Sequence, residues 1–327
     1  MNITRTFENN EYVFKKKSKK IIDSNTLDRI KSLKIPPAYT NVKISSNSSS
    51  KIQAVGIDTK KRKQYLYHKN HTKKQSKIKF NDLIIFGKKI KRIRKDINNN
   101  IYKCSKNKNF LKNKDFIIII ILYLIDNCNF RVGCEKYKKL YNTYGVTTLN
   151  KSHFKFNKKS VYINFIGKKG IINKTKINNY NVCAILKILC HSNKEFLFYY
   201  TDDNENTYRI TEKHINLFLK KYHKNITVKM FRTWNSNYIL LKELLNYSIP
   251  KTETEARKNI STSIKKAASK LHHSSNVSKK SYVNNEIVEL YLHDIKKFKK
   301  SIEFFRKTNG NLPSINRLLN LILKMLV

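Results

Sequence analysis

The chain has 327 residues and carries 69 Lys and Arg against 22 Asp and Glu, a formal net charge of +47 at neutral pH. This charge favours a polyanionic partner, with nucleic acid the first expectation and a membrane surface or a solvated lysine coat the alternatives, while 40% apolar residues exclude a disordered basic tail. Five cysteines without a CxxC pair, and an N-terminus without an apolar segment, predict a reduced, intracellular protein with no structural metal and no signal peptide.

The first 75 residues consist of short alternating segments that predict strands separated by polar turns. The segments are NEYVFKKK, YTNVKISS, KIQAVGID and RKQYLYHK. SSNSSS at 45–50 is the expected exposed loop. We therefore expect two domains, a β-rich domain over 1–76 and a larger one over 77–327.

From residue 77 the apolar spacing becomes helical, first over 81–97 and then in an apolar run at 116–125. The run is too short to span a bilayer, which needs about 20 apolar residues, and Asp126 interrupts it. Its isoleucines favour a buried strand locally, but its length favours a central helix over 115–129 with Asp115 as N-cap. This helix ends just before Arg131.

Alternating residues at 153–156 and 161–166, followed by a GKKG turn, predict a hairpin. The remainder has helical spacing. The expected helices are 181–192, 211–223, 229–246, 253–270, 280–300 and 313–326. The fold class is thus α+β, with a small β-rich N-terminal domain and a mainly α-helical domain that contains a small antiparallel sheet.

Common enzymatic motifs are absent from the sequence. There is no GxxxxGK[ST], no HExxH, and no cluster of acids suited to Mg²⁺. An ATPase or a two-metal nuclease is therefore disfavoured. What the chain offers instead is a set of basic and phenolic residues at the ends of predicted elements.

These residues lie in segments that resemble the poxvirus-type type IB DNA topoisomerases, relatives of the tyrosine recombinases. The resemblance begins with KIPPAYTNV and VGIDTKKRKQYLYH and continues through NFRVGCEKY, NFIGKKG, VKMFRTW and HSSNVSKKSY. It implies five catalytic residues in family order: Arg131, Lys168, Arg232, His273 and Tyr282. Singly, each would more often be an ordinary surface or core residue, and we keep that interpretation for His272. The five together, in order and within matching motifs, favour the site.

Each implied role suits its side chain. A tyrosine nucleophile conserves the phosphodiester bond energy in a phosphotyrosine, so no ATP is needed. Fixed guanidiniums and an imidazole can stabilise the charge on the nonbridging oxygens, each by about 3 kcal/mol. The resemblance assigns Lys168 as the proton donor to the expelled 5′ oxygen.

The resemblance also implies contacts with DNA. In QYLY the alternation of a strand places Tyr65 and Tyr67 on one face. The implied DNA contacts are Gln64, Tyr65, Tyr67, Lys136, Tyr137 and Lys229. Two positions depart from the poxvirus pattern, Cys134 in place of lysine and Lys169 in place of an acid, and these bear on sequence preference more than on catalysis.

The function implied is relaxation of supercoiled duplex DNA by a monomeric, C-shaped clamp, through a 3′-phosphotyrosyl intermediate and without ATP, metal or other cofactor. No membrane association is expected, and the resemblance suggests the virion and the host-cell cytoplasm as location. A tyrosine recombinase or integrase is the nearest alternative, although Lys229 stands where recombinases have histidine. A non-catalytic architectural DNA-binding protein is the alternative of another class.

Overall fold

The computed structural model describes residues 1–298, 319–320 and 323, and the chain divides into two compact units, Met1–Lys79 and Phe80–Val327. The division lies three residues after the one expected from the sequence and falls inside a long helix, α2 (Lys69–Lys106). The predicted helix at 81–97 is the central part of α2.

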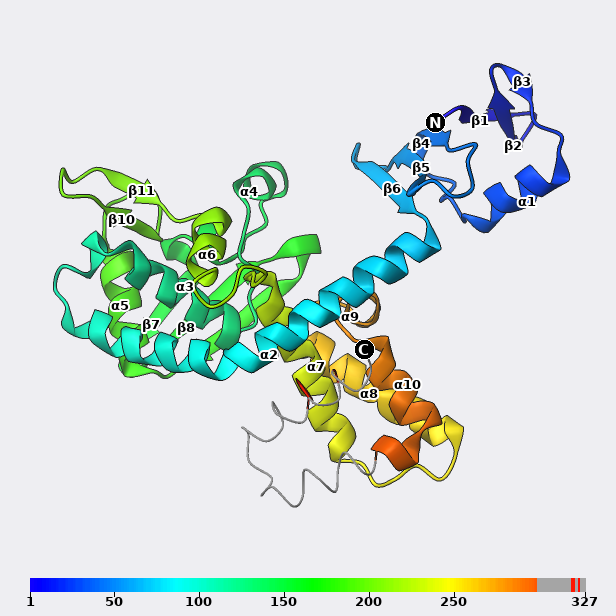
Figure 1. Cartoon of the computed structure of the whole chain (residues 1–327). Coiled ribbons are helices and arrows are strands. Elements are labelled where there is room, and N and C mark those ends of the chain that lie inside the picture. The colour runs from blue at the N-terminus through cyan, green and yellow to red at the C-terminus, as the bar shows by residue number, and fades with distance from the viewer. Residues whose placement is uncertain (299–318, 321–322, 324–327) are drawn as a thin grey trace. The chain divides into compact units, whose positions relative to one another are not determined.

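The N-terminal unit is one antiparallel six-stranded sheet with one helix inserted between its strands and the start of α2 at its end (Figure 1). The strand order is β3-β2-β1-β4-β5-β6. Ile3, Ile30 and Ala54 are among the residues of its small core. The bounds are β1 (Ile3–Glu8), β2 (Glu11–Lys16), β3 (Lys19–Lys20), α1 (Ser24–Ser32), β4 (Thr40–Ile44), β5 (Ile52–Ile57) and β6 (Lys63–Tyr67). The four predicted strand segments are confirmed, while β1, β3 and α1 were not predicted.

The apolar run is the central helix of the second unit, α3 (Lys114–Asn127). Residues 117–122 are all buried, because α3 contacts α6 (Glu212–Leu219), α7 (Lys229–Leu245) and β10 (Tyr199–Thr201). The predicted N-cap was wrong. Asn113, not Asp115, caps α3, since its side-chain oxygen accepts the N–H groups of residues 115 and 116 at 2.9 and 3.3 Å.

The second unit also contains a three-stranded antiparallel sheet of order β7-β8-β9. Its strands are β7 (Phe154–Asn157), β8 (Ser160–Ile166) and β9 (Ile172–Ile177). The predicted hairpin is β7–β8, but the GKKG turn joins β8 to β9, a strand that the sequence analysis missed. A second small sheet pairs β10 with β11 (Thr207–Arg209).

The remaining helices of the described residues agree with the prediction in part. They are α4 (Glu135–Tyr141), α5 (Tyr180–His191), α8 (Glu253–Lys270), α9 (Ser275–Ser281) and α10 (Asn285–His293), besides α6 and α7. The predicted helix over 280–300 was wrong, because α9 ends at Ser281 and α10 begins at Asn285. The helix expected at 313–326 lies largely outside the described residues. Within those residues, no helix combines the length and apolar character needed to cross a bilayer.

Candidate active site

Tyr282 lies in the break between α9 and α10. Ser274 caps the start of α9, and the side chain of Asn284 caps α10 by accepting the N–H of Glu286 at 2.8 Å. Because a new helix is capped at Asn284, the chain must leave α9 just before it, and Tyr282 takes the non-helical conformation φ −123°, ψ −41°. This break holds the Tyr282 side chain, 7% exposed, inside the unit.

Asn237 of α7 holds this break in place. The sequence analysis did not select this residue. It is fully buried, and its amide nitrogen donates to the carbonyl of Tyr282 at 2.9 Å while its oxygen accepts the N–H of Asn284 at 2.8 Å. Its position, five residues after Arg232 on one helix, was the only signal in the sequence.

Two buried side chains flank the ring of Tyr282. His273 is stacked on it, with ring centres 4.8 Å apart and an angle of 11° between the planes. The guanidinium carbon of Arg232 lies 5.5 Å from the ring centre. Arg232 is 4% exposed and donates from Nη2 to the carbonyl of Leu271 at 2.6 Å.

Both flanking residues carry polar atoms without a partner. Nε and Nη1 of Arg232 and Nε2 of His273 are buried and have no hydrogen-bond partner among the described residues. Leaving a buried polar group unpaired costs about 1–3 kcal/mol, and more for a charged group. The Arg232 nitrogens are donors suited to an anion such as a phosphate, and Nε2 of His273 becomes one when it is protonated.

Arg131 reaches the same place from the segment after α3. Its carbonyl accepts the N–H of Val146 at 2.8 Å, so its backbone is paired with a second segment. The two segments are in close contact, because a Cβ on Gly145 would lie 2.5 Å from the nitrogen of Gly133. Arg131 is half-buried, and its positive charge acts on Arg232, His273 and Tyr282.

Lys168 is the second residue of the GKKG turn between β8 and β9. Gly170 and Lys169 have φ values of +76° and +66°, which give the turn its tight shape. Burial lowers the pKa of Lys168, and the positive charges of Arg131, Lys169 and Lys229 lower it further, against an opposing effect of Tyr282. Lys168 therefore lies near Arg131, Lys229 and Tyr282.

The crowding of positive charge shifts the other groups as well. Burial and the charge of Arg131 lower the pKa of Arg232 to about 10. Burial, with the charges of Arg232 and Arg131, lowers the pKa of His273 to about 4, so its ring is neutral at pH 7. Burial alone would raise the pKa of Tyr282, but the charges of Arg232 and Arg131 outweigh it, and that pKa is lowered.

The structure thus brings all five predicted catalytic residues together, from segments between 131 and 282. His272, which we had set aside, donates to the carbonyl of Cys128 at 3.2 Å and packs near Phe130. These contacts are structural, as expected for a residue outside the catalytic set.

The predicted DNA contacts lie in three places. Lys229, the first residue of α7, is exposed and its charge acts on both Lys168 and Tyr282. Lys136 and Tyr137 are exposed on α4, where Tyr137 stacks on Tyr141 with ring centres 6.0 Å apart.

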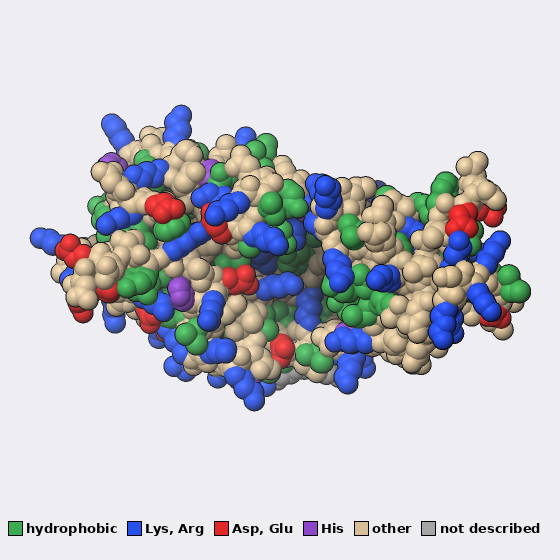
Figure 2. Space-filling view, turned by 90° about the horizontal axis from the view of Figure 1, so that it is seen from above, with side chains coloured by type: hydrophobic (Ala, Val, Ile, Leu, Met, Phe, Trp, Pro, Cys, Tyr) green, Lys and Arg blue, Asp and Glu red, His purple; other side chains and the backbone are tan. Residues whose placement is uncertain are grey.

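Gln64, Tyr65 and Tyr67 lie on β6 of the N-terminal unit. The tyrosines are 44% and 46% exposed on one face, with ring centres 6.3 Å apart, as the alternation predicted. Gln64 donates to a carboxylate oxygen of Asp58 at 2.9 Å. Figure 2 shows Lys and Arg side chains spread over the visible face, with few acids between them.

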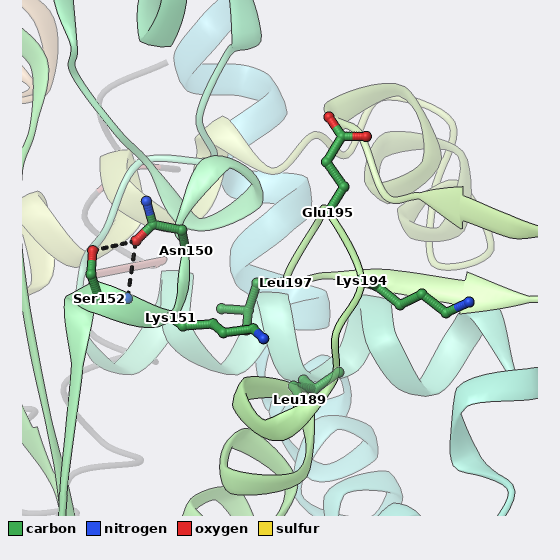
Figure 3. Close-up of a pocket in the computed structure, with 7 residues that line it drawn as sticks. All are labelled: Asn150, Lys151, Ser152, Leu189, Lys194, Glu195 and Leu197. Atoms are coloured by element: carbon green, nitrogen blue, oxygen red, sulfur yellow. Dashed lines mark hydrogen bonds between the residues drawn. The ribbon is translucent and has the colours of Figure 1, made fainter.

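A separate small pocket of about 280 Å³ contains none of these residues (Figure 3). Its Asn150 and Ser152 are hydrogen-bonded to each other, and Lys194 and Glu195 point away from them. No group of three His, Cys, Asp or Glu is placed to hold a metal ion in the part of the chain that the structure describes.

Comparison with known proteins gives consistent results. Residues 59–309 match the family model described as eukaryotic DNA topoisomerase I, catalytic core, and residues 11–58 match that of the bacterial DNA topoisomerase IB N-terminal domain. DNA topoisomerase 1B of Acanthamoeba polyphaga mimivirus is 35% identical over 295 residues, 87% of this chain and 83% of the relative. DNA topoisomerase 1 of rabbit fibroma virus is 27% identical over 279 residues, and DNA topoisomerase 1B of vaccinia virus is 26% identical over 276, each covering 82% of both chains.

Proposed function

Because the chain belongs to the type IB DNA topoisomerase family, we propose that it relaxes supercoiled duplex DNA by transient cleavage of one strand through a 3′-phosphotyrosyl bond at Tyr282. The observation that carries this proposal is the position of Tyr282, buried between Arg232 and His273 whose outer polar atoms have no partner. A scissile phosphate would supply acceptors for the Arg232 nitrogens.

In the proposed step the Tyr282 oxygen attacks the phosphorus. The O–P bond to tyrosine forms as the P–O5′ bond breaks, the phenol proton passes to solvent water, and Lys168 gives its proton to the 5′ oxygen. The lowered pKa values of Tyr282 and Lys168 support both transfers, because each group gives up its proton more readily than usual. Resealing is the reverse reaction, with the 5′ hydroxyl as nucleophile.

Arg131, Arg232 and His273 hold the nonbridging oxygens in this proposal. A guanidinium offers several N–H donors in a fixed plane, and buried donors act strongly on charge that develops in the transition state. His273 donates the hydrogen bond of its δ nitrogen to the carbonyl of Ser274 at 3.2 Å, so its Nε2 must take up a proton to donate to the phosphate.

DNA binding would use both units. Gln64, Tyr65 and Tyr67 of the N-terminal unit and Lys136, Tyr137 and Lys229 of the second unit would contact the duplex. Exposed aromatic side chains and a half-buried amide side chain on a strand suit contacts in the major groove. Lys229, next to the catalytic groups, suits a phosphate beside the scissile one.

The proposed reaction requires neither ATP nor a divalent metal, since the tyrosine conserves the bond energy and the cationic side chains stabilise the charge. One copy of the chain supplies all five catalytic groups, which supports a monomer. The viral relatives support a location in virions and in the cytoplasm of infected cells.

The recombinase alternative is not favoured, because the matched families and the relatives named above are topoisomerases. An architectural DNA-binding role would give no reason for the unpartnered donors around Tyr282.

The strand polarity of the covalent bond tests the proposal. A duplex that the protein cleaves is labelled at either the 5′ or the 3′ end of the cleaved strand. It is then incubated with the protein and denatured with SDS. The 5′-labelled fragment should migrate with the protein and the 3′-labelled fragment should be released. A 3′-labelled adduct, or an adduct formed by Tyr282→Phe, would refute the proposed intermediate.

A further inference from the structure

A buried polar network joins three helices at the end of α3, outside the residues assigned to chemistry. Arg94 of α2 binds both carboxylate oxygens of Asp126, with Nε–Oδ2 at 2.7 Å and Nη2–Oδ1 at 2.9 Å. Asp126 is 7% exposed. A buried carboxylate is tolerated when such a two-pronged pair and further hydrogen bonds compensate its lost hydration.

Asn235 of α7 completes the network. Its amide nitrogen donates to the Asp126 carbonyl at 2.9 Å and to the Asn129 side-chain oxygen at 2.9 Å. Its oxygen accepts from Arg94 Nη2 at 3.0 Å. One side chain therefore connects α7 with α2 and with the end of α3.

Both catalytic arginines are close to this network in the chain. Asn235 follows Arg232 by three residues, so the two share one face of α7. Asn129, with φ +55°, turns the chain after α3 two residues before Arg131. Phe130 between them is fully buried against Phe165, with ring centres 4.8 Å apart. The network thus attaches the segment that carries Arg131 to the helix that carries Arg232.

The two arginines need such support because their charges repel each other. In the protein without DNA, the positive charge of Arg131 is among the causes that lower the pKa of Arg232, and no acid is among the groups that shift this pKa. Packing and hydrogen bonds must therefore hold the guanidiniums at the separation that a phosphate requires.

We propose that Asn235, together with Asp126 and Arg94, is a positioning residue that sets the place of Arg131 relative to Arg232 and thereby builds the phosphate clamp. This inference rests on the proposed function. It adds residues that do not touch the substrate and that no sequence motif indicated.

The test is a double-mutant cycle on the full chain, read as the rate of SDS-trapped adduct formation on supercoiled plasmid with protein in excess. Asn235→Ala should slow the reaction roughly 10- to 100-fold, the cost of misplacing a catalytic group by about 1 Å. In an Arg131→Ala background it should cost less than about threefold, because the group it positions is already gone.

Asn259→Ala is the matched control, since Asn259 is another buried asparagine whose side chain donates to Tyr291 Oη at 3.1 Å. It should leave the rate within about threefold of wild type at a comparable loss of melting temperature.

Should Asn235→Ala fold poorly, Arg94→Gln is the second variant, because the Arg94 side chain is 32% exposed. It should show the same dependence on Arg131.

An equal slowing in both backgrounds, or no slowing by Asn235→Ala, would overturn the inference. Failure of the proposed function looks different. In that case wild-type protein forms no adduct, Tyr282→Phe forms one, or Arg131→Ala is as fast as wild type, and the positioning role falls with it.

Discussion

Lys168 lies in a tight turn near other cationic side chains and has a lowered pKa, and these two features define its expected behaviour. As a proton donor it must be protonated before cleavage. Because its pKa is lowered, the cleavage rate should begin to fall at a lower pH than for an ordinary lysine as pH rises. The pH–rate profile of single-turnover cleavage measures this.

Substitution of the leaving group separates proton donation from positioning. Lys168→Ala should slow cleavage by about 10²- to 10⁴-fold on ordinary DNA. With sulfur in place of the bridging 5′ oxygen most of that loss should disappear, because a thiolate leaves without a proton. An equal loss on both substrates would assign Lys168 a role other than proton donor.

His273 is neutral in the protein without DNA, since its pKa is about 4 instead of 6.5. A phosphate beside its ring raises that pKa again, so at pH 6 DNA binding should take up as much as about one proton. Calorimetry of Tyr282→Phe binding DNA, in buffers of different ionisation enthalpy, measures the uptake. Tyr282→Phe with His273→Gln is the control, and the same uptake in both proteins would contradict this account.

At the scale of elements, the break between α9 and α10 presents Tyr282, and Asn237 holds this break. Asn237→Ala should slow adduct formation roughly 10- to 100-fold by displacing the nucleophile. DNA affinity should stay within about threefold, because Asn237 is buried away from the surface. Rapid-mix cleavage and filter binding, with melting temperature as a check on folding, test this. A change confined to DNA affinity would refute it.

The close contact between the segment that carries Arg131 and the segment at 145–147 should also be sensitive to substitution. Gly145→Ala would place a Cβ 2.5 Å from Gly133 N and 2.7 Å from Arg131 O, so the two segments must separate. We expect slower cleavage than in wild type. Thr143→Ala is the control, since it is a nearby polar side chain with a long hydrogen bond of 3.4 Å to the carbonyl of Tyr137. Cleavage by Gly145→Ala at the wild-type rate would show that Arg131 tolerates the displacement.

The sequence predicted correctly those elements whose pattern of apolar residues follows directly from which side chains are buried. The run at 116–125 was identified as a buried element because it is apolar on every side, and its length then favoured a helix over a strand. Helix ends were harder, since two capping residues can compete within a few positions, as at Asn113 and Asp115. The break at Tyr282 was missed because capping by Asn284 and the hydrogen bonds of Asn237 are interactions that periodicity does not report.

In the site, too, some residues could be predicted from the sequence and others could not. The five proposed catalytic positions were predicted from motifs, while the network of Arg94, Asp126 and Asn235 was not. Its members lie on three helices far apart in the chain, so only the fold brings them together.

At the scale of the whole molecule, the charge of +47 predicts binding that depends steeply on salt. A protein that contacts 6–10 phosphates loses about 10³- to 10⁵-fold in affinity between 50 and 200 mM salt. Lys136→Ala should reduce the slope of log K against log salt by about one, whereas exposed Lys194, beside the separate pocket, should leave it unchanged when replaced by alanine. Equal slopes for both variants would remove Lys136 from the DNA interface.

In the proposed mechanism Tyr282 carries out strand transfer in a single chain without ATP or metal. The most direct measurement is relaxation of negatively supercoiled plasmid in EDTA without ATP, comparing wild type with Tyr282→Phe at equal DNA occupancy. We predict that wild type relaxes the plasmid and that the variant only binds it. Relaxation by both proteins, or by neither while both bind, would contradict the assignment of Tyr282 as the nucleophile of a metal-independent reaction.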